Sequence, residues 1–152
     1  MGVELKKLNK METNRIPEYR GKDGTGEWRY GSLMVEIRKI HNVDQFLFTI
    51  REIDGRSEVI VDGKTVGQLI GLVDKNGKKI FEGDIVRCWD GVGKKGELRR
   101  EYHTPMVVSY CQLWTAFVVE DKPYKTQFQL WKDFSAFEVI GNIHDNPELV
   151  KK

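Results

Sequence analysis

The sequence predicts an all-β or mainly β protein, and three features of the chain lead to that expectation. Short runs of alternating apolar and polar residues recur along the 152 residues, as they do in half-buried strands. Aromatic residues make up 11% of the chain, which supplies enough Trp, Phe and Tyr to fill a small core. Five dipeptides of the kind that closes β-hairpins punctuate these runs: Asp23-Gly24, Asp54-Gly55, Asp62-Gly63, Asn76-Gly77 and Asp90-Gly91.

Composition favours one globular domain. Hydrophobic residues make up 39% and charged residues 32%, so the chain is polar yet able to bury one core. Its 25 Lys and Arg residues against 23 Asp and Glu residues give a net charge of +2, too balanced to indicate a polyanionic partner. Cys88 and Cys111 are the only cysteines and lack metal-site spacing, so we expect reduced thiols and no cofactor. Without a membrane-length apolar run or a signal-peptide pattern, the expected location is the cytoplasm, with no membrane contact.

The N-terminal region predicts an extension followed by a hairpin. The chain starts Lys-rich and without a clear period, so we expect residues 1–14 to be a flexible extension and residues 15–152 to form one domain. Residues 15–32 predict a hairpin with its tip near Asp23-Gly24, and the alternation continues as far as Ile37.

The next segment predicts further strands separated by polar residues. Residues 41–44, His-Asn-Val-Asp, indicate a polar break. Residues 46–53 alternate in the manner of a half-buried strand. The β-branched run at residues 59–61 predicts a short strand between two Asp-Gly turns.

The central stretch, residues 65–90, predicts a strand, a corner and a second strand. Two apolar runs flank Asn76-Gly77, a dipeptide that adopts positive φ at low cost. A second tight turn at Glu82-Gly83 leads into a strand over residues 84–89.

The C-terminal half predicts more strands and two short helical turns. Residues 90–95 read as a Gly-rich loop, and strands are expected at residues 98–103, 106–111, 114–119 and 137–143. Residues 128–134 favour a short helical turn, although part of their spacing also fits a strand. Asn146 before Pro147 predicts a capped terminal turn.

Three segments carry a resemblance to a known family. Residues 71–86 contain the turn Asp74-Lys75-Asn76-Gly77 and the turn Glu82-Gly83-Asp84, residues 137–149 read Phe-Glu-Val-Ile-Gly-Asn-Ile-His-Asp-Asn-Pro-Glu-Leu, and residues 26–32 read Gly-Glu-Trp-Arg-Tyr-Gly-Ser. In this order they resemble the hallmark, the C-terminal signature and the N-terminal hairpin of the YopX family of small phage and prophage proteins. Three ordered motifs are more specific than any single turn.

The resemblance implies a small β-barrel like that of Src-homology-3 (SH3) domains, with an additional N-terminal hairpin region. It supplies no established catalytic residues. We therefore expect a non-enzymatic phage or prophage accessory protein that acts by binding, with a second copy of itself or a host or phage protein as partner. The family hallmark residues are expected to serve as turn residues: Asp74, Asn76, Gly77, Glu82, Gly83 and Asp84.

A first alternative is a nucleic-acid-binding barrel. The densest basic patch of the chain consists of Lys94, Lys95, Arg99 and Arg100, with Trp89 and Tyr102 close in sequence. Small barrels bind single strands by stacking bases on aromatic rings beside a cationic groove. The competing interpretation is a solvated loop next to core aromatics, and Glu97 and Glu101 dilute the positive charge.

A second alternative is a metal-dependent hydrolase that uses Asp74, Glu82 and Asp84, because clustered carboxylates hold metal ions and transfer protons. Turn formation by the two Asp residues is the simpler interpretation. The three His residues are scattered and give no ligand spacing.

The four tryptophans predict core positions, and some would suit a subunit interface: Trp28, Trp89, Trp114 and Trp131. A small β protein has sheet edges to cover, so we expect a homo-oligomer.

Overall fold

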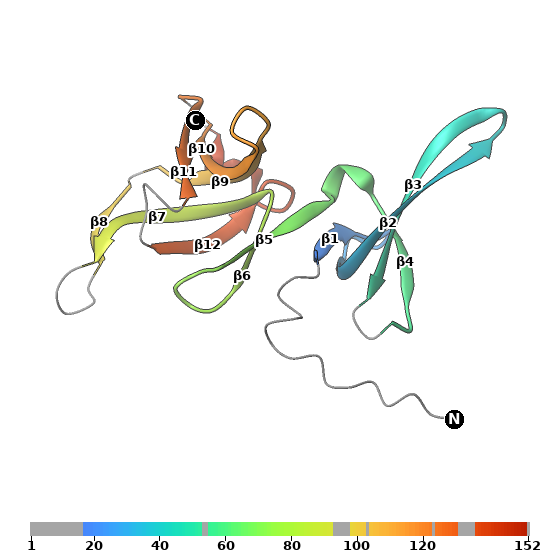
Figure 1. Ribbon diagram of the computed structural model, residues 1–152, viewed down its shortest axis with the longest axis horizontal. Helices are drawn as coiled ribbons and strands as arrows, with labels where there is room; N and C mark the ends of the chain where they lie inside the picture. Colours follow the sequence, from blue (N-terminus) through green and yellow to red (C-terminus); the bar gives the residue numbers. More distant parts are fainter. Residues whose placement is uncertain are drawn as a thin grey trace. The chain divides into compact units, whose positions relative to one another are not determined.

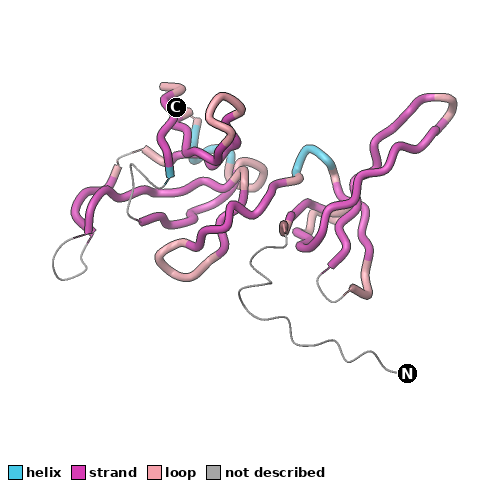
Figure 2. Tube along the Cα trace, viewed as in Figure 1, coloured by secondary structure: helices cyan, strands magenta, loops and turns pink. Residues whose placement is uncertain are grey.

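The structure, a computed structural model of the chain, describes residues 17–52, 55–92, 98–102, 104–122, 124–130 and 136–151 (Figure 1). The predicted extension, residues 1–14, lies outside these ranges. Strands dominate the described residues, and helical structure is confined to short turns (Figure 2). The mainly β prediction is therefore confirmed.

The described chain divides into two compact units, with the boundary between Gln68 and Leu69. The first unit contains β1 (Tyr19–Lys22), β2 (Trp28–Ile40), β3 (Val43–Glu52), β4 (Glu58–Val61) and the 3-10 turn η1 (Gly63–Thr65). Strand β5 (Gly67–Val73) crosses the boundary. The second unit continues with β6 (Lys79–Phe81), β7 (Asp84–Val92), β8 (Leu98–Glu101), β9 (Met106–Cys111), β10 (Ala116–Asp121), β11 (Thr126–Gln129), β12 (Ala136–Asn142) and the 3-10 turn η2 (Pro147–Val150).

The N-terminal unit is an antiparallel sheet in the order β4-β3-β2-β1, followed by the first residues of β5. The predicted first hairpin is confirmed as β1 and β2, with Asp23 at the start of its turn. An isolated bridge between Asp23 and Val61 joins the end of β4 to this turn. Ile50 is fully buried and Val61 nearly so, and they form the centre of the unit.

The predicted polar break at residues 41–44 is confirmed at His41 and Asn42 but is too wide, because Val43 and Asp44 already belong to β3. Only His41 and Asn42 leave the strands, with φ angles of 50° and 63°. Two successive positive φ values are the geometry of the two-residue turn that matches strand twist. Ile40 pairs directly with Val43, and β2 and β3 then stay in register over ten residue pairs. The signal was hidden because His replaces the usual Asn or Asp at the first position.

Two of the five turn dipeptides do not close hairpins. Asp62 instead caps η1, since its side chain accepts a hydrogen bond from the backbone N–H of Lys64 at 3.0 Å. Asp90-Gly91 lies within β7, where Asp90 pairs with Arg100 of β8, so the predicted loop at residues 90–95 begins too early. Pairing with β8 extends β7 beyond the point at which turn chemistry alone would end it.

The C-terminal unit has a sheet in the order β11-β10-β9-β7-β12, with β8 also paired to β7, and a β5–β6 hairpin. Its core consists of Ile80, Val86, Cys88, Met106, Val108, Val119, Leu130 and Phe137. The pairings of the described strands form an open path, so the barrel that the family resemblance implies is not confirmed.

The predicted helical turn at residues 128–134 is wrong at its start, because Phe128 and Gln129 belong to β11 and pair with β10. Leu130 is helical, and residues 131–135 lie outside the described ranges. Burial of Leu130 and packing of Phe128 on the core favour the strand at this point.

The chain requires glycine at position 31. Gly31 pairs with Tyr19 of β1 and Glu52 of β3, and a Cβ there would lie 1.9 Å from the carbonyl oxygen of Arg51. We expect Gly31→Ala to lower the free energy of unfolding by about 1–3 kcal/mol, the usual effect of overpacking. Denaturant titration followed by circular dichroism measures the change.

Gly24→Ala in the adjacent turn is the matched control, because a Cβ there meets no atom within 4 Å. Its effect should stay within about 0.5 kcal/mol. Equal stability of the two variants would contradict the close approach at Gly31.

Candidate functional site

The carboxylate of Asp74 organises the family hallmark. Asp74 is buried, and its Oδ1 accepts hydrogen bonds from the backbone N–H groups of Asn76 at 2.8 Å and Lys78 at 2.9 Å. Its Oδ2 accepts a third, from Val139 of β12, at 3.1 Å. The backbone N–H of Lys75 donates to the carbonyl of Phe137, also in β12. The turn therefore closes the β5–β6 hairpin and binds the edge of β12.

The pKa of Asp74 lies below its ordinary value. Burial by itself raises this pKa, but the hydrogen bonds from the backbone N–H groups of Lys78, Val139 and Asn76 outweigh burial. The carboxylate is thus held in its charged form by backbone donors, which is a structural use of an acidic group.

The second hallmark turn has the same character. Asp84 is 1% exposed, and its Oδ2 accepts a hydrogen bond from the backbone N–H of Phe81 at 2.8 Å. Gly83 adopts a φ of 84°, donates its N–H to Val108 and accepts from the N–H of Ile143. Glu82, the residue before Gly83, is half-buried. These contacts connect the hallmark to β9 and to the C-terminal signature.

The C-terminal signature forms a turn around Asn142. The Oδ1 of Asn142 accepts from the N–H groups of His144 and Asp145, and its Nδ2 donates to the Asp145 carboxylate at 2.7 Å. A Cβ at position 141 would lie 2.6 Å from the Oδ1 of Asn146, so a residue larger than Gly141 would clash with that side chain. Asn146 stands at the predicted cap position of η2 but makes no side-chain capping bond.

The hydrolase alternative draws no support from this geometry. Both oxygens of Asp74 hold backbone N–H groups, and one oxygen of Asp84 does the same. Within the described ranges, no group of three or more His, Cys, Asp or Glu side chains is placed to hold a metal ion.

The predicted basic patch is described only in part. Lys94 and Lys95 lie outside the described residues, whereas the backbone of Arg99 and Arg100 belongs to β8. Of the two predicted stacking residues, Trp89 is 8% exposed, with the Nζ of Lys75 4.4 Å from the centre of its ring. Tyr102 packs against the core and meets Phe128 edge-on. The nucleic-acid alternative stays a prediction.

The four tryptophans occupy different environments. Trp89 is buried, Trp28 is half-buried, and Trp114 lies in the β9–β10 turn with 41% of its surface exposed. Trp131 lies outside the described residues. The ring of Trp28 is covered by the guanidinium of Arg20 at 4.6 Å.

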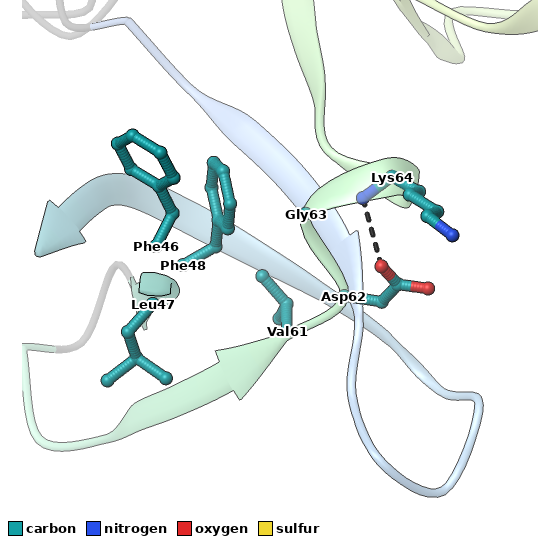
Figure 3. Close-up of a pocket in the computed structure, with 7 residues that line it drawn as sticks. All are labelled: Phe46, Leu47, Phe48, Val61, Asp62, Gly63 and Lys64. Carbon is teal, nitrogen blue, oxygen red and sulfur yellow. Dashed lines mark hydrogen bonds between the residues drawn. The ribbon is translucent and has the colours of Figure 1, made fainter. Parts of the chain in front are cut away.

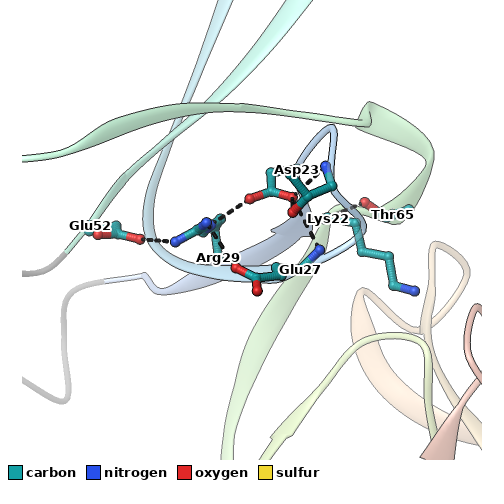
Figure 4. Close-up of polar contacts among 7 residues, drawn as sticks. Lys22, Asp23, Glu27, Arg29, Glu52 and Thr65 are labelled. Carbon is teal, nitrogen blue, oxygen red and sulfur yellow. Dashed lines mark hydrogen bonds and ion pairs between the residues drawn. The ribbon is translucent and has the colours of Figure 1, made fainter.

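A polar cluster fixes the first hairpin (Figure 4). Asp23 accepts hydrogen bonds from Thr25 and Glu27 and forms a 2.7 Å ion pair with the Nε of Arg29, which also approaches Glu27 and Glu52. The hydrogen bonds from the Thr25 side chain and from Arg29 hold the pKa of Asp23 well below its usual range. This cluster, like Asp74, maintains a turn.

Among the described residues, the outer part of the β2–β3 hairpin carries an exposed apolar surface. Strand β1 pairs with β2 only over residues 28–31, and β4 pairs with β3 only over residues 48–51. Residues 36–40 of β2 and 43–47 of β3, which we name the outer ribbon, therefore form a two-stranded extension of the sheet, visible at the β2–β3 end of Figure 1. Two-stranded ribbons are marginally stable alone in water.

One face of the outer ribbon is apolar. Residues paired across the strands share a face, and the pairs on this face, from the adjoining sheet outward to the tip, are Leu33 with Ile50, Val35 with Phe48, Ile37 with Phe46 and Lys39 with Asp44. Ile50 is fully buried, whereas Val35 is 49% exposed, Ile37 64% and Phe46 65%. An apolar stripe thus runs from the core of the N-terminal unit onto its surface and ends in one cation and one anion.

The opposite face of the ribbon is interrupted by polar groups. Its middle holds Glu36 and Arg38, which form a 2.9 Å ion pair, and Gln45 beside Arg38. Exposed Ile40 and Val43 sit at the tip, separated from half-buried Leu47 by these polar residues. The ribbon is therefore amphipathic, and its continuous apolar surface lies on the Ile37 and Phe46 face.

A shallow groove of about 500 Å³ adjoins that face, lined by Phe46, Leu47, Phe48, Val61, Asp62, Gly63 and Lys64 (Figure 3). The rings of Phe46 and Phe48 stand side by side, and Leu47 points the other way. A Cβ on Gly63 would lie 2.4 Å from the Phe48 ring, so η1 packs tightly against the inner end of the stripe.

The sequence showed the alternation of the ribbon but not its exposure. Residues 33–37 and 46–50 read as ordinary half-buried strands. The exposure arises because β1 and β4 have four residues each, against thirteen in β2 and ten in β3. The one indication of this exposure in the sequence was that the strand patterns of β1 and β4 are shorter than those of β2 and β3.

We expect Asp74→Asn to lower the free energy of unfolding by about 1–3 kcal/mol, because in either orientation its amide places an N–H donor against a backbone donor. Urea titration measures the loss. Asp62→Asn is the matched control. The exposed Asp62 side chain accepts one backbone hydrogen bond, from the N–H of Lys64, and an Asn side chain accepts it equally well. Equal effects of the two variants would contradict a central role for Asp74.

The lowered pKa of Asp74 also predicts a pH dependence. Its ionisation contributes stability that is present above the unfolded-state pKa of about 3.9 and is lost as pH falls through the folded-state pKa. The free energy of unfolding should therefore fall less in Asp74→Asn than in the wild type between pH 6 and pH 3. Parallel profiles would show that this carboxylate does not contribute.

Among the described residues, no helix has the length and apolar character needed to cross a membrane.

A search of curated proteins finds no match to the chain. The crystal structure of protein EF1440 from Enterococcus faecalis is 24% identical in sequence, with a TM-score of 0.47 over 90% of this chain and 99% of that one. The family model described as YopX protein matches residues 18–151, which include both hallmark turns and the Asn142 turn. The resemblance is confirmed, and the chain belongs to the YopX family.

Proposed function

We propose that this YopX-family protein is a non-enzymatic binding module that associates with itself, and that the apolar face of the outer ribbon is its contact surface. The observation that carries the proposal is the exposure of Val35, Ile37 and Phe46 in one continuous stripe. Apolar residues scattered singly on a surface are normal, but a continuous stripe is typical of an interaction site.

The stability of the ribbon supports the same proposal. Beyond β1 and β4, no other described strand pairs with β2 or β3, and Ile37 and Phe46 on the apolar face are largely exposed. Three or more strands, or a covering surface, are normally needed to keep such a face ordered. Association would supply the missing cover and remove Ile37 and Phe46 from water, at about 25 cal/mol for each Å² of apolar area.

Two of the acidic residues that suggested chemistry, Asp74 and Asp84, are used in folding, as is Asp23 of the first hairpin. Asp23, Asp74 and Asp84 each accept backbone hydrogen bonds at turns. In this proposal the protein works in the bacterial cytoplasm as a phage or prophage accessory factor. A host or phage protein that displaces the second copy from the ribbon is the alternative partner.

The test compares Phe46→Glu with the wild type by sedimentation velocity across a concentration series. The charge would enter the apolar contact, so we expect the dissociation constant of the assembly to rise at least about tenfold. Because Phe46 is 65% exposed, the unfolding midpoint should change little when both proteins are compared at concentrations at which both are monomeric.

Gln45→Glu is the matched control, since it introduces the same side chain at the neighbouring position on the opposite face. It should assemble like the wild type. A wild-type protein that stays monomeric at every concentration, or a Phe46→Glu variant that assembles normally, would refute the proposal.

A further inference from the structure

We infer that two copies of the chain pair through the apolar faces of their outer ribbons, about a twofold axis that runs along the ribbon. This inference rests on the proposed function and specifies its partner and geometry. It follows from the in-chain register, which places one member of each pair on β2 and the other on β3: Val35 with Phe48, Ile37 with Phe46, and Lys39 with Asp44.

Rotation about such an axis exchanges the two strands. With the axis midway between the facing ribbons, β2 of one copy lies over β3 of the other at the same level along the hairpin. Ile37 then packs on Phe46 of the second copy, and Lys39 faces Asp44 of the second copy. Ile37 and Lys39 therefore meet the same kind of neighbour that each has within its own chain, so an aliphatic group covers an aromatic ring and a cation meets an anion.

The other face-to-face arrangement fits poorly. A twofold axis across the strands places β2 on β2 and reverses the direction of the second ribbon. Centred at the level of Ile37, it sets Lys39 over Val35 and Asp44 over Phe48, so that both charges lie against apolar surface. Centred at the level of Lys39, it sets Lys39 against Lys39 of the second copy and Asp44 against Asp44 of the second copy, so that like charges meet.

The charge pattern also selects a second copy over a foreign partner. The face ends in one cation, Lys39, and one anion, Asp44, at positions that are paired across the strands. A uniformly acidic or basic partner would match one of them and repel the other. The exposed position of this pair at the ribbon tip means that it would govern specificity more than affinity.

The experiment uses complementary charge reversals in the full-length chain. Lys39→Glu leaves two anions at the tip of the face, and Asp44→Lys leaves two cations. Each variant alone would set like charges across the twofold axis, so we expect each to self-associate about tenfold more weakly than the wild type at low salt. Mixed in equal amounts, the two variants should form a heterodimer with two opposite-charge contacts and wild-type affinity.

Native mass spectrometry with one variant isotope-labelled counts the homodimers and heterodimers. The control pair is Glu36→Lys and Arg38→Glu, on the opposite face, which should assemble like the wild type and mix statistically. If mixing Lys39→Glu with Asp44→Lys restores the affinity of the dimer, the effect must arise between chains, because each variant chain still carries two like charges at the tip of its own face.

The remaining outcomes separate the two proposals. If Lys39→Glu and Asp44→Lys dimerise like the wild type without preferring each other, while Phe46→Glu disrupts assembly, the axis is wrong but the contact surface stands. A wild-type trimer or larger closed ring would also overturn the twofold arrangement. If Phe46→Glu leaves assembly intact, the proposed function itself fails.

Discussion

The C-terminal unit depends on the carboxylate of Asp74. One oxygen closes the β5–β6 turn through Asn76 and Lys78, and the other accepts the N–H of Val139 in β12. Because β7 is the one described strand that pairs with β12, the outer edge of β12 would otherwise present unpaired backbone groups. The hallmark turn covers part of that edge. The hallmark and the C-terminal signature, 65 residues apart at this contact, are therefore two sides of one interaction.

Several charged and amide side chains maintain turns in this protein. Asp23 anchors the first hairpin through Arg29, Asp84 holds the N–H of Phe81, and Asn142 organises the turn after β12. Each contact compensates the burial of a polar group with backbone or ionic partners. With these groups engaged in folding, the apolar face of the outer ribbon is the feature that folding leaves without a described partner.

Local chemistry predicted most of the strands because alternation and Gly-containing turns report on single elements. It failed where the neighbouring strand decides the outcome. Asp90-Gly91 stays extended because β8 pairs with it, and the four-residue polar break predicted at residues 41–44 narrows to a two-residue turn because Val43 pairs with Ile40. For the same reason the sequence identified Ile37 and Phe46 as strand residues but not as exposed ones. Exposure depends on where β1 and β4 end, which is a property of the assembled sheet.

The arrangement that holds the ribbon together within one chain also makes its face complementary to itself. Unlike residues oppose each other across the strands: Ile37 faces Phe46, and Lys39 faces Asp44. Such cross-strand pairs stabilise a hairpin by about 0.2–1 kcal/mol each. A twofold axis along the hairpin repeats the same pairings between copies, so selection for a stable ribbon would also favour a self-complementary surface. A ribbon with like residues across its strands would lack this property, because the same rotation would set like charges together.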